Sequence, residues 1–266
     1  MARRLLWASL GLAPVTIAVR FATDVSDVTL FVLAAIALVP LAWLIGEATE
    51  QASEHTGPGI GGFLNATFGN APELIIALFA IHDGLEEVVR GSLTGSVVGN
   101  LLLVLGFSLL VGPEDEIDRQ STLVSIALVL FASLLFLVVA VPAWNGSASE
   151  HALEVLTIPV SIVLLIIYVG VTWLQLRRHR MLHHEDDADA EAWPFKLSLA
   201  VLGVATVATA LVAEVLVGSI ETFAEKLHLS DFFVAAVIVA IVGNAAEHGG
   251  AVVIASRGKM KLATGL

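Results

Sequence analysis

The sequence predicts an all-α, polytopic membrane protein, and three observations carry that prediction. Hydrophobic residues make up 57% of the 266 positions and charged residues only 14%, whereas a soluble domain has about 45–50% and about 25%. Apolar segments long enough to cross a bilayer recur along the chain, whose mean hydropathy is +0.90. No segment alternates convincingly with the two-residue period that a membrane β-barrel requires.

A membrane-spanning helix needs roughly 20 mainly apolar residues. About eight segments qualify, and they are residues 5–21, 28–46, 60–81, 91–112, 121–141, 153–176, 197–220 and 231–256. The first follows a pair of arginines but lacks a good small-x-small cleavage site, so we interpret it as a helix and not as a signal peptide. Four glycines, at positions 91, 95, 99 and 106, give the fourth segment a small-residue face that permits close helix contact.

Composition also excludes several classes of function. The chain has no cysteine, which rules out disulfides and thiolate metal sites. The net charge of −12 argues against binding of nucleic acid, which needs a basic surface. We find no zinc-protease, nucleophile–base or phosphate-loop pattern, so the sequence does not predict an enzyme. No lysine lies inside a predicted span, which argues against a retinal-type photoreceptor.

Basic residues predict the orientation of the spans, because they collect on the cytoplasmic side. With eight spans and a cytoplasmic N-terminus, ten of the 13 basic residues fall inside. The inner set is Arg3, Arg4, Arg119, Arg177, Arg178, Arg180, Lys196, Arg257, Lys259 and Lys261, and the outer set is Arg20, Arg90 and Lys226. The polar linker 177–196, with its run of acidic residues, is then cytoplasmic. The simplest location is a prokaryotic plasma membrane.

A Gly-Asn-x-x-Glu pattern occurs twice, each time near the middle of an apolar segment. The first copy holds Asn70 and Glu73, and the second holds Asn244 and Glu247. Because the two polar residues of each copy are three positions apart, they share one face of a helix. A carboxylate at that depth is costly and indicates a functional site. Two copies of one pattern are harder to attribute to packing than a single buried acid.

The two copies enter the bilayer from opposite sides. Segment 60–81 is expected to run outward and segment 231–256 inward, which is typical of inverted-topology repeats with a substrate site at their interface. Acidic pairs precede both motifs, and they are Glu50 with Glu54 and Glu221 with Glu225. We expect the first pair to face the cytoplasm and the second the outside, as acidic vestibules that concentrate cations. Solvated helix ends are the alternative interpretation of both pairs.

Two carboxylates and two amide oxygens suit a divalent cation such as Ca²⁺, which takes 6–8 oxygen ligands. Pro72 has no amide hydrogen for the carbonyl of Phe68, which leaves that oxygen free to turn toward an ion. Burial disfavours a charged carboxylate, so an empty site is expected to hold protons on Glu73 and Glu247. A bound divalent cation would expel them, and competition for one site would produce antiport.

Two further residues are candidates for proton coupling. His248 follows Glu247 directly, and an unperturbed histidine titrates with a pKa near 6.5. Glu214 lies inside the apolar run 211–217. A structural hydrogen-bonding role is the alternative for each residue.

Several stretches of this sequence resemble the calcium/proton antiporters of the calcium/cation antiporter superfamily. The two most specific are GGFLNATFGNAPELIIAL at 61–78 and IVGNAAEHGGA at 241–251. Weaker similarity lies in GEATE at 46–50, GSVVGNLLLVLG at 95–106 and LVGSIE at 216–221. The resemblance implies that Glu73 and Glu247 bind the cation and the proton, with Asn70 and Asn244 beside them. It also implies an acidic cytoplasmic linker between the halves.

The resemblance further implies one extra N-terminal helix followed by two repeats of five spans. We therefore expect the extra helix at 1–27, a first repeat at 28–176, the linker at 177–196, and two helices of a second repeat at 197–266. The second repeat is thus incomplete in this sequence, and the counterpart of the segment from Gly95 to Asn100 is missing from it.

Two alternatives to Ca²⁺/H⁺ exchange stay open. A sodium/calcium or other cation exchanger would use the same framework, although sodium coupling favours more Ser, Thr and Asp near the carboxylates than the Gly-Gly-Ala run that follows Glu247 and His248. Manganese or another divalent ion fits the same ligands. A cation channel is the alternative of a different class. No cofactor is expected, the partners are Ca²⁺, H⁺ and the lipid bilayer, and a homo-oligomer stays open.

Overall fold

The structure is a computed structural model that describes residues 2–22, 24–112, 150–182 and 193–256, with isolated positions between 123 and 137. These residues form helices and no strand. They divide into two compact units. The larger combines residues 1–115 with 187–264, so both predicted halves contribute to it, and the smaller covers residues 116–186. The helical membrane fold that the sequence predicts is confirmed.

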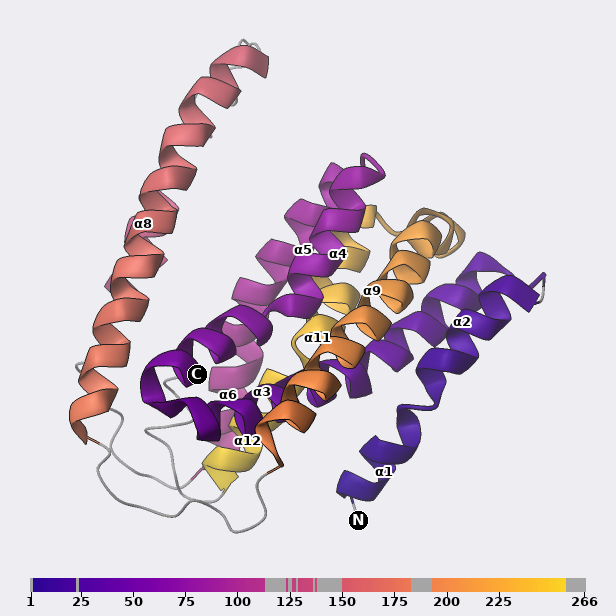
Figure 1. Cartoon of the computed structure of the whole chain (residues 1–266). Coiled ribbons are helices and arrows are strands. Elements are labelled where there is room, and N and C mark those ends of the chain that lie inside the picture. The colour runs from indigo at the N-terminus through magenta and orange to yellow at the C-terminus, as the bar shows by residue number, and fades with distance from the viewer. Residues whose placement is uncertain are drawn as a thin grey trace. The chain divides into compact units, whose positions relative to one another are not determined.

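The larger unit begins with two short helices and one long one. Helix α1 spans Ala2–Ser9, α2 spans Leu12–Ala22 and α3 spans Asp27–Phe68. The first predicted span therefore consists of two helices that meet near Gly11. Helix α3 has 42 residues, far more than the roughly 20 that cross a bilayer, and Figure 1 shows that it is bent. Phe68 at its end packs against the cluster that contains Leu44 and Ile45.

Helix α3 also passes through residues 47–59, where the sequence indicated a connection between two spans. The hydroxyl side chains of this polar stretch are satisfied within the helix. Thr49 donates to the carbonyl of Ile45 at 2.7 Å, and Ser53 donates to the carbonyl of Thr49 at 2.7 Å. Such bonds to the preceding turn are compatible with a helix and often bend it. The expected boundary between two helices is therefore wrong here, and the chain leaves helical geometry only after Phe68.

The other helices follow the predicted segments closely. Their bounds are α4 Ala71–His82, α5 Glu86–Gly99, η1 Asn100–Val104, α6 Leu105–Val111, α8 Glu150–Leu182, α9 Phe195–Lys226, α10 Asp231–Val234, η2 Ala235–Val239, α11 Ala240–Gly243 and α12 Ala245–Ser256. The two elements named η are short π-helical turns, which occur mostly as single turns within α-helices and often near functional sites. One lies in each of two spans that meet at the candidate site.

Four helices in the described part of the chain are long and apolar enough to cross a membrane. They cover Arg4–Ala22, Asp27–Thr56, Glu86–Val111 and Phe195–Lys226. Shorter apolar helices cover Ala71–His82, Thr157–Gly170 and Asp231–Gly243. Of the predicted span 121–141, the structure describes residues 123, 126–127, 129–135 and 137, all of them helical. Residues 183–192 of the linker 177–196 lie outside the described residues. The count of eight spans stays a prediction.

The core of the larger unit lies where α3 and α9 pack side by side (Figure 1). Phe31 of α3 stacks on Phe223 of α9, with ring centroids 4.0 Å apart. Leu38, Leu216 and Ile220 are fully buried in the same cluster. Interfaces of this kind hold membrane helices together through close van der Waals packing, because lipid supplies little hydrophobic drive between helices. The α3–α9 pair thus joins the two halves of the sequence.

Helix α5 reaches the second half through glycines. A Cβ atom added at Gly91 would lie 2.8 Å from the Cβ of Ala235, and one added at Gly95 would overlap the carbonyl group of Ala236. The backbones of α5 and η2 therefore touch at positions where only glycine fits. Gly106, three turns further along the same span, has no atom of the described residues within 4 Å of such a Cβ. The predicted small-residue face serves this contact at Gly91 and Gly95 but not at Gly106.

Replacement of Gly95 by alanine is expected to push α5 away from η2 and to lower the stability of the protein. Overpacking of a close contact costs about 1–3 kcal/mol. The matched control is Gly106→Ala, which we expect to be neutral or slightly stabilising because alanine favours the helix by roughly 0.5–1 kcal/mol. Thermal unfolding of both variants in detergent checks the pair. Equal melting temperatures would contradict the close contact.

Candidate functional site

Both Gly-Asn-x-x-Glu motifs interrupt their helix at the asparagine. Helix α3 ends two residues before Asn70 and α4 begins directly after it, while α11 ends directly before Asn244 and α12 begins directly after it. The backbone angles agree closely, with φ −96° and ψ 11° at Asn70 and φ −91° and ψ 11° at Asn244. The repeated sequence therefore folds into a repeated local structure. Broken helices at membrane depth are tolerated where they line a protein cavity.

Glu73 of the first motif meets the backbone of the second. It lies in the first turn of α4, after Pro72, and it is buried. A Cβ added at Gly243 would lie 2.9 Å from Oε1 of Glu73. Neither carboxyl oxygen has a hydrogen-bond partner in another described residue. A charged carboxyl group in this state is costly, so burial favours its neutral form.

Asn244 is buried and is held by its side-chain amide. Its Nδ2 donates to Oγ of Ser96 on α5 at 2.9 Å and to the carbonyl of Ala240 one turn earlier at 2.9 Å. Both amide hydrogens are thereby used, so the side-chain oxygen Oδ1 remains as an acceptor that can ligate an ion. The contact ties the second motif to the segment in which Ser96 lies.

Asn100 connects the other two polar groups of the second motif. Its Oδ1 lies 3.1 Å from Nε2 of His248, and its side chain also hydrogen-bonds Glu247. Since a carboxylate only accepts, the amide nitrogen of Asn100 donates to Glu247, and its oxygen accepts from His248. This arrangement leaves the His248 Nε2 protonated. Glu247 and His248 are both half-buried, and their side chains are more exposed than that of Glu73.

The site can hold a cation with few formal charges. Glu73 and Glu247 lie close enough to interact electrostatically. Among the described residues, no group of three or more His, Asp or Glu side chains could hold a metal ion. The remaining ligands of a Ca²⁺ ion would therefore be amide, hydroxyl and backbone oxygens or water, all of which Ca²⁺ accepts. The two carboxylates repel each other, so a positive charge placed between them would be favourable.

Two predicted residues have other positions in the structure. The side chain of Asn70 is exposed at the first helix break, in contrast to the buried Asn244. Glu214 is also exposed, between the buried residues Ala213 and Val215 of α9. The roles predicted for Asn70 and Glu214 stay predictions.

The predicted outer acidic pair lines a cavity. Glu221 and Glu225, both exposed on the last turns of α9, border a volume of about 600 Å³ together with Glu87 and Asp231. Glu87 comes from the start of α5 and Asp231 from the start of α10. Four acidic side chains from three helices thus surround one opening. Glu50 and Glu54 of the other pair are exposed on α3.

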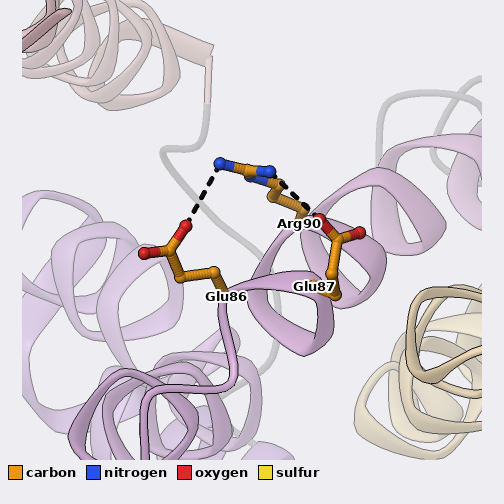
Figure 2. Close-up of polar contacts among 3 residues, drawn as sticks. All are labelled: Glu86, Glu87 and Arg90. Carbon is orange, nitrogen blue, oxygen red and sulfur yellow. Dashed lines mark hydrogen bonds and ion pairs between the residues drawn. The ribbon is translucent and has the colours of Figure 1, made fainter. Parts of the chain in front are cut away.

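Arg90 partly neutralises this acidic surround. Figure 2 shows it between Glu86 and Glu87, with Nη2 3.2 Å from Oε2 of Glu86 and Nη1 3.1 Å from Oε1 of Glu87. All three side chains are more than half exposed. Exposed ion pairs of this kind contribute about 0–1 kcal/mol. The pairs therefore bear on the local charge at the cavity more than on stability.

Sequence reasoning missed the part of the site that α5 and η1 supply. Ser96 and Asn100 are four residues apart, so they share a helix face, and both lie in an apolar segment. Polar residues in such segments usually face the interior of the bundle, which was the signal available in the sequence. Only the structure brings them against Asn244 and His248.

Replacement of Ser96 by alanine is expected to lower stability by about 1 kcal/mol, because it removes the acceptor for the buried amide of Asn244. The matched control is Ser108→Ala on the neighbouring helix α6. Ser108 is fully buried and its hydroxyl has no partner in the described residues, so its loss should be neutral or stabilising. The thermal unfolding midpoints of the two variants in detergent test the bond. Equal effects would contradict the assignment.

Comparison with known proteins agrees with this geometry. The profile of the family described as "Sodium/calcium exchanger protein" matches residues 26–177 and 197–266. The Ca(2+)/H(+) antiporter ChaA of Bacillus subtilis is 39% identical over 244 residues, which cover 88% of this chain and 69% of that protein. The vacuolar calcium ion transporter of Schizosaccharomyces pombe is 37% identical over 250 residues, which cover 90% of this chain and 61% of that protein.

Solved structures have the same fold. Native YfkE superimposes with a TM-score of 0.79 at 32% identity, over 99% of this chain and 75% of that one. The H+/Ca2+ exchanger CAX superimposes with a TM-score of 0.70 at 17% identity, over 98% of this chain and 68% of that one; at that identity the likeness concerns the fold. The matched segments include both Gly-Asn-x-x-Glu motifs, and the chain belongs to the sodium/calcium exchanger protein family.

Proposed function

We propose that this integral membrane protein exchanges Ca²⁺ for H⁺, with Glu73 and Glu247 binding the calcium and the protons in turn. The observation that carries the proposal is the buried Glu73 carboxyl, which lies against Gly243 of the second motif without a hydrogen-bond partner among the other described residues. Relatives named Ca(2+)/H(+) antiporters, at 35–39% identity, support the same reaction. The chain spans 69–70% of the length of these relatives and 57–61% of the length of the vacuolar relatives it matches.

Antiport follows from competition at one site. With no cation present, protons neutralise the two carboxyl groups, because an unpaired carboxylate away from water is costly. A divalent cation favours the ionised forms and displaces the protons. Asn244 supplies an oxygen ligand, and Asn70 is proposed to supply another when the first break turns inward. His248, linked to Glu247 through Asn100, is proposed to pass protons between the site and water, with Glu214 in a secondary role.

The two segments matched by one family profile are proposed to be inverted repeats. The near-identical backbone angles at Asn70 and Asn244 support a common origin for both motifs. The proposed division is an extra helix at 1–27, repeats at 28–176 and 197–266, and a cytoplasmic linker at 177–196. Transporters built this way bind their substrate where the repeats meet. The N-terminus is proposed to be cytoplasmic, in a prokaryotic plasma membrane.

Other cation exchange reactions fit the same framework. Carboxylate and amide oxygens also bind Mn²⁺, and the family includes sodium/calcium exchangers by its description. We favour protons as the counter-ion for two reasons. The hydrogen bonds described above connect a titratable histidine to the second motif, and they connect only one hydroxyl, that of Ser96, whereas sodium coupling favours several. A cation channel would conduct without a pH gradient. A homo-oligomer is compatible with both an exchanger and a channel.

Replacement of Glu73 by glutamine is expected to abolish calcium flux driven by a pH gradient across vesicles. The amide cannot carry the charge that a proton or Ca²⁺ neutralises, so both binding steps fail. In weakly buffered detergent solution, calcium should release protons from the unaltered protein, and the variant should release fewer and need at least about ten-fold more calcium to do so, since a charged ligand contributes about 1.5–3 kcal/mol. The proton release needs binding only and therefore tests the site separately from flux.

Glu86→Gln is the control, because Glu86 is an exposed carboxylate outside the site. It should keep both flux and proton release. Calcium flux that ignores the pH gradient would identify a channel, and flux driven by sodium would identify a sodium/calcium exchanger. Normal proton release from Glu73→Gln would overturn the role of Glu73.

Neutralisation of Glu221 and Glu225 by glutamine is expected to weaken the apparent affinity for external Ca²⁺ several-fold at low ionic strength. Their charges line the cavity of about 600 Å³, and such a field raises the local concentration of cations. The effect should fade in about 0.15 M salt, where the screening length is about 8 Å. Initial flux rates against calcium concentration at two salt concentrations check this. A salt-independent loss would instead indicate direct ligation.

A further inference from the structure

An apolar groove of about 460 Å³ runs between the N-terminal helices and the core. Its lining includes Leu6 and Leu12 of the N-terminal helices, Phe31 and Ile36 of α3, and Ile238 and Val242 of the second half. Ser9 also borders the groove, but its hydroxyl donates to the carbonyl of Leu6 at 2.8 Å and is therefore satisfied. A groove without free polar groups suits hydrocarbon and offers nothing to an ion or a polar solute.

The groove opens toward the surroundings of the spans. Val32 and Ile36 line it on α3, and they are 42% and 51% exposed. Both lie in the span Asp27–Thr56, the most apolar of the four candidate spans. Because the environment of this span is the hydrocarbon of the bilayer, an acyl chain can enter the groove from the side. The groove comes close to the candidate ion site, since its lining residue Val242 directly precedes Gly243.

A cluster of three tryptophans begins next to the groove along the chain, because Leu6 lines the groove and Trp7 belongs to the cluster. Trp7 follows Leu6 and packs edge-on against Trp43, with ring centroids 5.5 Å apart, and its ring lies 6.0 Å from that of Trp193. The backbone of Trp193 is anchored to α3, where its N–H donates to Oε1 of Gln51 at 2.8 Å and its carbonyl accepts from Nε2 of His55 at 2.6 Å. Tryptophans collect at the level of lipid headgroups.

Two cationic side chains flank this cluster in a chain whose net charge is −12. Arg4 precedes Trp7 by one turn of α1, and Lys196 follows Trp193 by three residues at the start of α9; both are exposed. On α3 the acidic residues Glu50 and Glu54 lie beside Gln51 and His55. The two cationic residues near the cluster therefore come from α1 and α9. Basic residues near the bilayer surface attract anionic lipids.

We propose that the groove binds an acyl chain of an anionic phospholipid, whose phosphate group lies at the tryptophan cluster beside Arg4 and Lys196. The apolar walls select the chain, the aromatic rings fix the depth of the headgroup, and the two cations select its charge. A lipid bound in this way packs directly on the segment that carries the second Gly-Asn-x-x-Glu motif.

Fluorescence quenching tests this site in the full chain. The chain has five tryptophans, and Trp144→Phe with Trp173→Phe leaves the three of the cluster as fluorophores. The protein is reconstituted in phosphatidylcholine vesicles that contain increasing fractions of phosphatidylglycerol, brominated near the ester end of its acyl chains. A specific site gives quenching that saturates at a low fraction of this lipid. Arg4→Gln and Lys196→Gln should each raise the fraction at half-quenching about five-fold.

Val32→Phe fills the groove and should remove the saturable quenching. The matched control is Val207→Phe, at an exposed position of α9 that does not line the groove, and it should keep that quenching. If Val32→Phe fails to fold, the two charge variants still decide the matter, because their side chains are exposed.

Three results would overturn the proposal. Quenching that rises in proportion to the brominated lipid in every variant would indicate ordinary contact with the bilayer. Equal saturable quenching by brominated phosphatidylcholine, unchanged by the charge variants, would indicate a site for neutral lipid. If the protein with Val32 intact is quenched no more than the Val32→Phe variant, then protein fills the groove, either a second copy of the chain or another of its segments.

Discussion

A helix that breaks inside a bilayer must satisfy its backbone and polar side chains within the protein, and this constraint governs the site. At the second break, the backbone N–H of Asn244 still reaches the carbonyl of Ala240 at 3.1 Å, and the N–H of His248 reaches the carbonyl of Asn244 at 2.9 Å. The side-chain amide of Asn244 donates its two hydrogens to the carbonyl of Ala240 and to Oγ of Ser96. The break is therefore short, because backbone hydrogen bonds form on both sides of Asn244.

Close backbone approach is the second requirement, and glycine supplies it. Gly95 lets α5 touch η2, which brings Ser96 and Asn100 to the second motif. Gly243 leaves room for the carboxyl group of Glu73. A β-carbon at either position would separate the two halves of the site. The same glycines that look like simple packing residues are thus the reason that titratable groups distant in sequence can lie close together.

Much of this architecture could be predicted from the sequence, because the bilayer imposes a strong and readable pattern. Apolar segments revealed most helices, and the paired motifs revealed the buried Glu73 and Asn244. The prediction failed at residues 47–59, where polar side chains suggested a connection. Those hydroxyls instead bond to carbonyls of the preceding turn, which is compatible with a helix that continues to Phe68. Periodicity reports burial, and it cannot distinguish an exposed polar loop from an exposed polar stretch of helix.

The sequence by itself determined the membrane environment, the helical class, and the asparagine and glutamate of each motif as candidate site residues. It could do so because hydrophobicity and the cost of a buried carboxylate depend only on local composition. Tertiary structure alone decided which groups meet. Asn100 joins Glu247 to His248, Glu73 lies against Gly243, and Glu87 joins the outer acidic cavity. These contacts depend on how helices cross and how closely their backbones approach, and a linear pattern contains no information on either.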